Sequence, residues 1–106
     1  MANKITDETL DAILKEKKYV VIDFWANWCN PCKMLSPIID ELEDDYEGRV
    51  YIGKVNVDDN DDTVERYGIR NLPTIVFIKE GEEIGRMAGA VPKQKIEDKL
   101  KELFGV

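Results

Sequence analysis

The apolar residues of this chain recur with two alternating periods, and the alternation predicts strands and helices in turn. Residues 19–25 form a nearly continuous β-prone run, which is typical of a strand buried on both faces. Between residues 31 and 42 the apolar positions follow helical spacing, with acidic residues near the end of the segment. Three more β-prone runs predict strands at residues 50–57, 74–78 and 83–88. The last two are expected to form an antiparallel hairpin, because a tight turn at Glu80 and Gly81 joins them.

The remaining segments complete the alternation. A short first strand is expected near residues 4–5, followed by a helix that Thr6 caps and whose first turn carries Asp7. Residues 63–67 predict a short helix, and Pro92 opens a last amphipathic one. The order predicts an α/β fold in which a central mixed five-stranded sheet is flanked by four helices.

Both cysteines of the chain, Cys29 and Cys32, lie where the strand at residues 19–25 leads into a helix. Helical residues three apart have β-carbons about 5–6 Å from each other, and a disulfide needs α-carbons about 4.4–6.8 Å apart, so the spacing permits a disulfide. Unpaired N–H groups at a helix start favour a thiolate, most strongly at the outer residue, Cys29. Pro31 suits a first turn, because its missing N–H has no partner to lose there. The pattern predicts a redox centre.

Other interpretations of the cysteine pair lead to different chemistry. A structural zinc site needs four ligands, whereas the chain has two cysteines and no histidine, so no metal site is expected within one chain. A structural disulfide across two residues closes a tiny loop and therefore stabilises little. An intersubunit metal site and coincidence stay open. The acidic run at residues 58–62 lacks the glycine and the glutamate of a calcium loop, so a solvated loop is expected there.

Composition narrows the function classes. A chain of 106 residues buries one core without disulfide staples, so a single domain over residues 1–106 is expected. Fifteen Lys and Arg against 22 Asp and Glu give a net charge of −7, which argues against a nucleic-acid partner. No apolar run is long enough for a signal peptide or a membrane span, so no membrane association and a cytoplasmic location are expected. In that compartment a CxxC pair is more often catalytic than structural.

Asp23 is the most conspicuous polar residue, because it interrupts an otherwise apolar strand. A buried carboxylate is costly unless it is paired, so its pKa is expected to rise. An aspartate at a strand end in water is the alternative. Lys54, a lone charge in the strand at residues 50–57, is the candidate partner of Asp23, and an exposed strand lysine is the alternative.

Together these segments resemble the thioredoxin family over essentially the whole chain. The resemblance rests on Asp23-Phe24-Trp25-Ala26 before Trp28-Cys29, on Pro37, on Tyr67-Gly68-Ile69-Arg70, on Pro73-Thr74, and on Gly81 and Gly89. It implies a thioredoxin fold and a protein disulfide reductase without a bound cofactor. In that activity Cys29 attacks a target disulfide, Cys32 resolves the mixed disulfide, and Asp23 accepts a proton from Cys32.

The resemblance also implies a substrate-binding surface around the cysteines. Its residues would be Trp28, Asn30, Pro31, Leu72, Pro73, Gly89 and Ala90. The peptide bond before Pro73 would be cis, with the backbone of Leu72 pairing with an extended substrate, whereas the sequence alone also fits a strand-opening proline. Asn30 stands where the family usually has glycine, so we expect it to change the balance between dithiol and disulfide.

The implied partners are disulfide-containing proteins and a thioredoxin reductase that draws on NADPH, and the chain is expected to be a monomer. The absence of a histidine between the cysteines favours a reductant. An oxidant or isomerase of the same fold is one alternative, and its reduction potential would distinguish it. A binding subunit in which the cysteines are dispensable is another, and a cysteine-free variant would keep its function.

Overall fold

A mixed five-stranded sheet forms the centre of the computed structural model, which describes residues 2–106. The strands are β1 (Asn3–Lys4), β2 (Tyr19–Trp25), β3 (Tyr51–Asn56), β4 (Thr74–Lys79) and β5 (Glu82–Ala88), in the spatial order β1-β3-β2-β4-β5. Strands β1, β3 and β2 pair in parallel, whereas β4 is antiparallel to both β2 and β5. The predicted mixed sheet and its hairpin are confirmed, with β2 at the centre.

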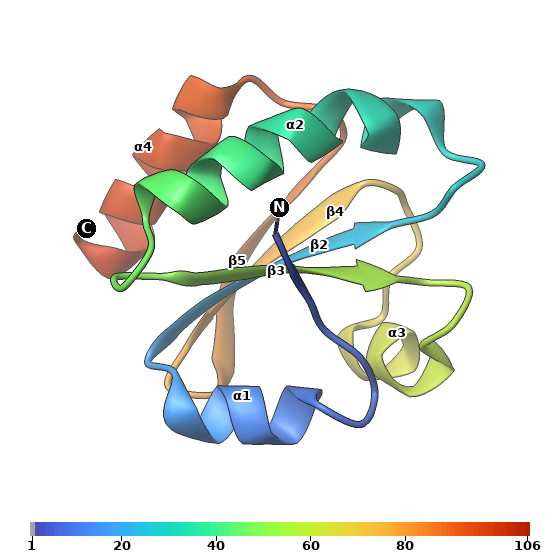
Figure 1. Cartoon of the computed structure of the whole chain (residues 1–106), viewed down its shortest axis with the longest axis horizontal. Coiled ribbons are helices and arrows are strands. Elements are labelled where there is room, and N and C mark those ends of the chain that lie inside the picture. The colour runs from blue at the N-terminus through green and yellow to red at the C-terminus, as the bar shows by residue number, and fades with distance from the viewer. Residues whose placement is uncertain (1) are drawn as a thin grey trace.

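Two helices cover each face of the sheet (Figure 1). The helices are α1 (Leu10–Glu16), α2 (Asn30–Asp45), α3 (Asp61–Tyr67) and α4 (Lys93–Phe104). Alternate residues of β2 explain the layers, because Val21 packs in one core with α2 and α4, and Ile22 packs in the other with α1 and α3. None of these helices, across the described residues, is long and apolar enough to cross a membrane.

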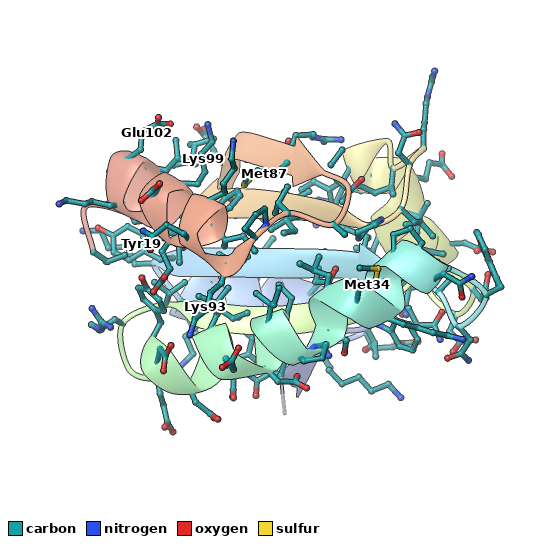
Figure 2. The ribbon with its side chains drawn as sticks, turned by 90° about the horizontal axis from the view of Figure 1, so that it is seen from above. Tyr19, Met34, Met87, Lys93, Lys99 and Glu102 are labelled. Carbon is teal, nitrogen blue, oxygen red and sulfur yellow. A yellow bond between two sulfur atoms is a disulfide. The ribbon has the colours of Figure 1, made fainter. Side chains whose placement is uncertain are left out.

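The layer formed by α2 and α4 is joined by polar and aromatic contacts as well as by its apolar core. In the view from above, Lys93 at the start of α4 reaches toward α2 (Figure 2). Its ammonium is 2.8 Å from a carboxylate oxygen of Asp45. At the other end of α4, the ring of Phe104 stacks on Tyr19 of β2, with centroids 4.6 Å apart. These contacts link α4 to α2 at one end and to the sheet at the other.

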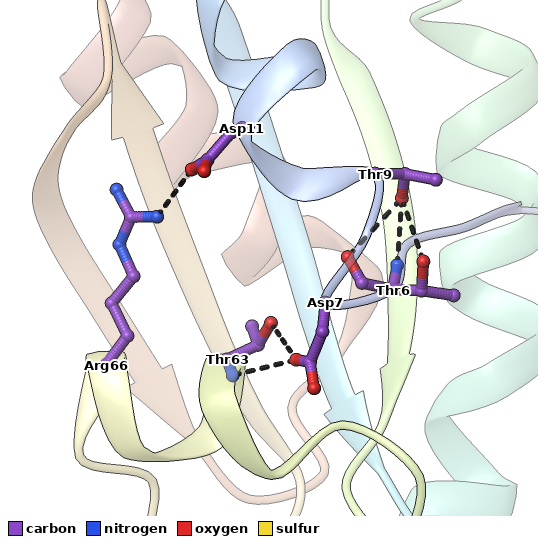
Figure 3. A network of polar contacts seen from close by, with 6 residues as sticks. All are labelled: Thr6, Asp7, Thr9, Asp11, Thr63 and Arg66. Atoms are coloured by element: carbon purple, nitrogen blue, oxygen red, sulfur yellow. Dashed lines mark hydrogen bonds and ion pairs between the residues drawn. The ribbon is translucent and has the colours of Figure 1, made fainter.

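The first helix begins at Leu10, later than expected, because Asp7 serves a different helix. An Asp7 carboxylate oxygen accepts hydrogen bonds from the backbone N–H and the hydroxyl of Thr63, at 2.9 and 2.6 Å (Figure 3). The bond from the Thr63 hydroxyl contributes most to lowering the pKa of Asp7 below its usual value. The carboxylate thus caps α3, while a turn closed by the Thr6 carbonyl precedes α1.

Gly53 of β3 lies where three strands approach closely. It pairs with Asn3 of β1 and with Ile22 of β2. A β-carbon at this position would lie 2.6 Å from a side-chain carbon of Ile5 and 2.8 Å from the backbone oxygen of Asn3. The sheet therefore requires glycine here.

We expect Gly53→Ala to lower the free energy of unfolding by about 1–3 kcal/mol, because the backbone of β1 must move to admit the methyl group. Urea unfolding measures the loss. Gly85→Ala in β5 is the matched control, since its β-carbon would meet only the flexible end of Leu103 inside 3.0 Å. Equal losses in the two variants would contradict the argument from close backbone approach.

Candidate active site

The two cysteines lie at the carboxyl end of β2, where the chain turns into α2. Cys29 is the N-cap of α2, and its sulfur accepts a hydrogen bond from the Cys32 backbone N–H at 3.2 Å. The two residues form a disulfide with α-carbons 5.3 Å apart, within the range that the spacing predicted. Cys29 is 6% exposed and Cys32 is 2% exposed, so Cys29 is the more accessible residue of the pair. A thiolate at Cys29 would be stabilised by the N-terminus of α2.

The surroundings of the disulfide are mainly apolar. Ala26 is buried against the cysteines, and Trp25 and Leu72 pack on the same cluster. Trp28 is 68% exposed, and its indole N–H donates to an Asp58 carboxylate oxygen at 3.1 Å. The loop after β3 therefore holds an aromatic ring beside the redox pair. Sequence reasoning assigned Asp58 only to a solvated loop, because no local pattern links it to Trp28.

The proline segment before β4 lies next to this cluster. The Leu72–Pro73 peptide bond is cis, as the family resemblance implied. The carbonyl of Pro73 accepts a hydrogen bond from the N–H of Gly89 at 2.9 Å, which joins the end of β5 to the same region. The structure thus brings Leu72 and its neighbours to the cysteines from a distant part of the chain. Ala90, which follows Gly89, is exposed.

The first turn of α2 presents two exposed side chains between the cysteines. Asn30 and Pro31 are both exposed, while the cysteines on either side are buried. Pro31 occupies the first turn of the helix, as predicted. A substrate approaching Cys29 would therefore meet Asn30 and Pro31 at the surface.

Asp23 lies beneath the redox pair on the face of β2 that α2 covers. It is 1% exposed, and neither carboxylate oxygen has a hydrogen-bond partner within residues 2–106. Burial raises the pKa of Asp23 to about 7, opposed by the positive charge of Lys54 and reinforced by the negative charge of Asp40. Asp23 and Cys32 line the same cavity, which has a volume of about 480 Å³. Asp23, with its raised pKa, and Cys32 thus share one cavity.

Lys54 lies beside Asp23 without a direct ion pair to it. The two residues are register partners on β3 and β2, yet the Lys54 ammonium is 3.1 Å from Asp40 and also donates to the Ser36 hydroxyl. Lys54 therefore lowers the pKa of Asp23 by its charge alone, without a hydrogen bond to the carboxylate. An ion pair of Lys54 with Asp40 costs less desolvation free energy than one with Asp23, because Asp40 is partly exposed and stays charged, whereas burial favours a neutral Asp23.

Ser36 and Asp40 are site residues that sequence reasoning missed. They follow Cys32 at intervals of four residues along α2, so they share its helix face. That spacing was available in the sequence, but it is indistinguishable from the solvated side of an amphipathic helix without knowing what the helix covers.

Comparison with known proteins agrees with the family resemblance of the sequence. The family model described as Thioredoxin matches residues 1–102. The chain is 50% identical over 101 residues to Thioredoxin 2 of Chlorobaculum tepidum, covering 94% of this chain and 93% of that protein. It is 50% identical over 93 residues to Thioredoxin of Chlorobaculum thiosulfatiphilum, covering 88% and 86%. It is 40% identical over 101 residues to Thioredoxin 1 of Nostoc sp., covering 94% of each chain.

Proposed function

This chain belongs to the thioredoxin family of protein-disulfide oxidoreductases, and on that premise we propose that Cys29 attacks target disulfides and Cys32 resolves the mixed disulfide. The exposure of the two cysteines supports this division of roles. Cys29 is the more exposed residue and caps α2, where a thiolate is favoured, whereas Cys32 is more deeply buried and lines the same cavity as Asp23. The position of the pair above a buried, unpaired carboxyl is the single observation that carries the proposal.

The reaction is a two-step exchange. The Cys29 thiolate attacks one sulfur of the target disulfide, so the target S–S bond breaks, a mixed disulfide forms, and the other target sulfur leaves as a thiolate. Cys32 then gives its proton to the Asp23 carboxylate and attacks the Cys29 sulfur, which releases the second target thiolate. Two electrons pass to the target, and the Cys29–Cys32 disulfide remains.

Asp23 suits the role of proton acceptor for two reasons. Asp23 and Cys32 line the same cavity, which supports proton transfer between them. Its pKa of about 7 means that both protonation states are populated at neutral pH, which favours proton exchange in either direction. In this scheme Lys54 acts as a nearby charge and not as a hydrogen-bond partner.

We expect Asp23→Asn to slow resolution of the mixed disulfide by about tenfold or more near neutral pH and to remove the dependence of the rate on pH around 7. Stopped-flow reduction of a protein disulfide over a pH series measures both effects. Asp44→Asn, at an exposed carboxyl of α2 outside the cavity, is the control and should keep the parent profile. An unchanged profile in Asp23→Asn would rule out the acid–base role.

The substrate-binding surface is proposed from the residues around the disulfide. It comprises Trp28, Asn30, Pro31, Leu72, Pro73, Gly89 and Ala90. Exposed aromatic and proline surface beside the attacking sulfur suits an extended or unfolded protein segment, whose backbone would pair with that of Leu72. Asn30, between the cysteines, would tune the balance between dithiol and disulfide.

Members of the family act on disulfide substrates and are usually reduced by thioredoxin reductase. For this chain we propose a cognate reductase that draws on NADPH, and action as a monomer of one domain in the cytoplasm. A reducing compartment supports the cycle because it returns Cys29 and Cys32 to the dithiol. Sedimentation of the pure chain and cell fractionation would test the last two points.

The decisive experiment is reduction of a protein disulfide with thioredoxin reductase and NADPH supplied. At a catalytic dose, each molecule of the chain should reduce many target disulfides. A variant that lacks both cysteines should reduce none. No turnover by an intact dithiol would favour the oxidant or isomerase, and the reduction potential would then decide. A cellular role that survives removal of both cysteines would favour the binding subunit.

A further inference from the structure

Three residues at intervals of four share one face of α2, and two of them, Cys32 and Ser36, line the cavity that Asp23 also lines. The three are Cys32, Ser36 and Asp40, and the last two share one partner. The Lys54 ammonium donates to the Ser36 hydroxyl and lies 3.1 Å from an Asp40 carboxylate oxygen. The same Asp40 oxygen accepts the backbone N–H of Ala2 at 2.8 Å. The ammonium is thus held from the α2 side of the cavity.

Nothing in the sheet prevents Lys54 from pairing with Asp23. The two residues are register partners on adjacent parallel strands, whose backbones are about 4.8 Å apart, and both line the cavity. A lysine side chain can readily span that distance. Neither Asp23 oxygen nevertheless has a partner in the described chain. The position of the ammonium is therefore decided by α2 and not by the register of the strands.

We propose that Asp40 and Ser36 are positioning residues that hold the Lys54 ammonium against α2 and so keep the Asp23 carboxyl free of a direct ion pair. Asp40 and Asp23 compete for one cation, and Asp40 holds it in the structure. The relevance to catalysis rests on the proposed function, in which Asp23 must exchange a proton with Cys32.

The charges around Asp23 show what release of Lys54 would do. Besides Lys54 on β3, the cavity is lined by Lys33 of α2, Lys4 of β1 and Asp59 of the loop after β3, and Asp40 lies behind Lys54. The β4 side offers only Ile75 in register. Lys54 and Asp40 are the two charges that act on the Asp23 carboxyl appreciably. An ammonium moved onto Asp23 would favour its charged form and weaken it as a base.

The test follows the titration of Asp23 by carboxyl ¹³C NMR in the oxidised protein. Asp40→Asn should move the Asp23 midpoint down by about one pH unit, because it frees Lys54 to approach the carboxylate. Ser36→Ala leaves every charge in place and should move the midpoint in the same direction by a smaller amount. Asp40→Glu, which keeps an ion-pair partner on α2, should restore most of the parent midpoint.

A Lys54→Met background separates positioning from the direct charge of Asp40. If Asp40 acts through Lys54, then Asp40→Asn should shift the midpoint much less in this background than in the parent. Equal shifts in the two backgrounds would show that Asp40 acts by its own charge, and this would overturn the proposal. No shift from Asp40→Asn in the parent would overturn it as well.

The same variants distinguish this inference from the proposed function. If the Asp23 midpoint moves as expected and the pH profile of disulfide reduction moves with it, both stand. If the midpoint moves while the reduction profile does not, the positioning of Lys54 is supported and the proton-transfer role of Asp23 fails.

Discussion

A Cys32→Ser variant is expected to accumulate as a covalent adduct with its protein substrate, linked through Cys29, and to lose turnover by on the order of 10³-fold or more. The first attack needs only Cys29, which is the more exposed cysteine and the N-cap of α2. Without the Cys32 thiol, no group of the chain can attack the mixed disulfide. Mass spectrometry under non-reducing conditions should find the sum of the two protein masses, and added dithiol should separate them.

The matched variant is Cys29→Ser, which keeps the other sulfur. It should form no adduct, because Cys32 is only 2% exposed and is buried within the first turn of α2. If Cys29→Ser traps substrate while Cys32→Ser does not, the roles of the two cysteines are reversed. The pair of variants therefore tests the asymmetry of the site independently of the steady-state assay.

Asp23→Asn is expected to raise the free energy of unfolding of the oxidised protein above that of the parent. This gain should be larger at about pH 8 than at about pH 4 by on the order of 4 kcal/mol. In the folded chain the pKa of Asp23 is raised to about 7, whereas the ordinary value is 3.8. The native state therefore holds a proton that the unfolded state releases. Native Asp23 begins to cost stability as the pH rises above about 4, and the cost grows until about pH 7 and is constant above it.

The side-chain amide of the Asp23→Asn variant has nearly the same shape and no charge, so it does not lower the free energy of unfolding as the pH rises. Urea unfolding of Asp23→Asn and the parent at several pH values should give curves that lie close at low pH and separate between about pH 4 and about pH 7. Asp44→Asn is the control, because that residue is exposed and lies outside the cavity that Asp23 lines, so its removal should leave the parent curve unchanged. A stability difference independent of pH would mean that Asp23 titrates as an ordinary carboxyl in the folded state.

Burial of Asp23 is a compromise between stability and the proposed activity. A buried carboxyl with no hydrogen-bond partner among residues 2–106 lowers stability at neutral pH, and an apolar or amide residue would remove the penalty. The same burial brings its pKa into the range that suits the proton exchange with Cys32 that we propose. Asp40 and Ser36 keep Asp23 in this condition, because they hold the Lys54 ammonium. An ammonium paired with Asp23 would reduce both the stability cost of the buried carboxylate and its strength as a base.

Much of this site was predictable because its signals are local. The apolar run of β2 predicted the buried strand that contains Asp23, and the spacing of Cys29 and Cys32 at a helix start permitted a disulfide at the carboxyl end of that strand. Such patterns can be identified from the sequence because the residues involved lie close together within one helix or strand, whose period fixes the face on which each residue lies. The family resemblance added the cis bond before Pro73, since the sequence alone fitted an ordinary strand opening.

The contacts that sequence reasoning missed join residues distant in the chain. Asp7 caps a helix 56 residues away through Thr63, and Trp28 is held by Asp58, 30 residues away. No periodic pattern connects such pairs, because their approach depends on how whole elements pack.

The sequence by itself determined the order of the elements and a redox-active cysteine pair at the start of α2, whereas the burial of Asp23 was one of two alternatives that it left open. Only the tertiary structure decided which carboxylate receives the Lys54 ammonium. Asp23 and Asp40 both lie within reach of that cation, and the choice depends on the burial of each carboxyl and on the position of the Ser36 hydroxyl. Solvation and side-chain geometry at that scale exist only after β2, β3 and α2 have packed together.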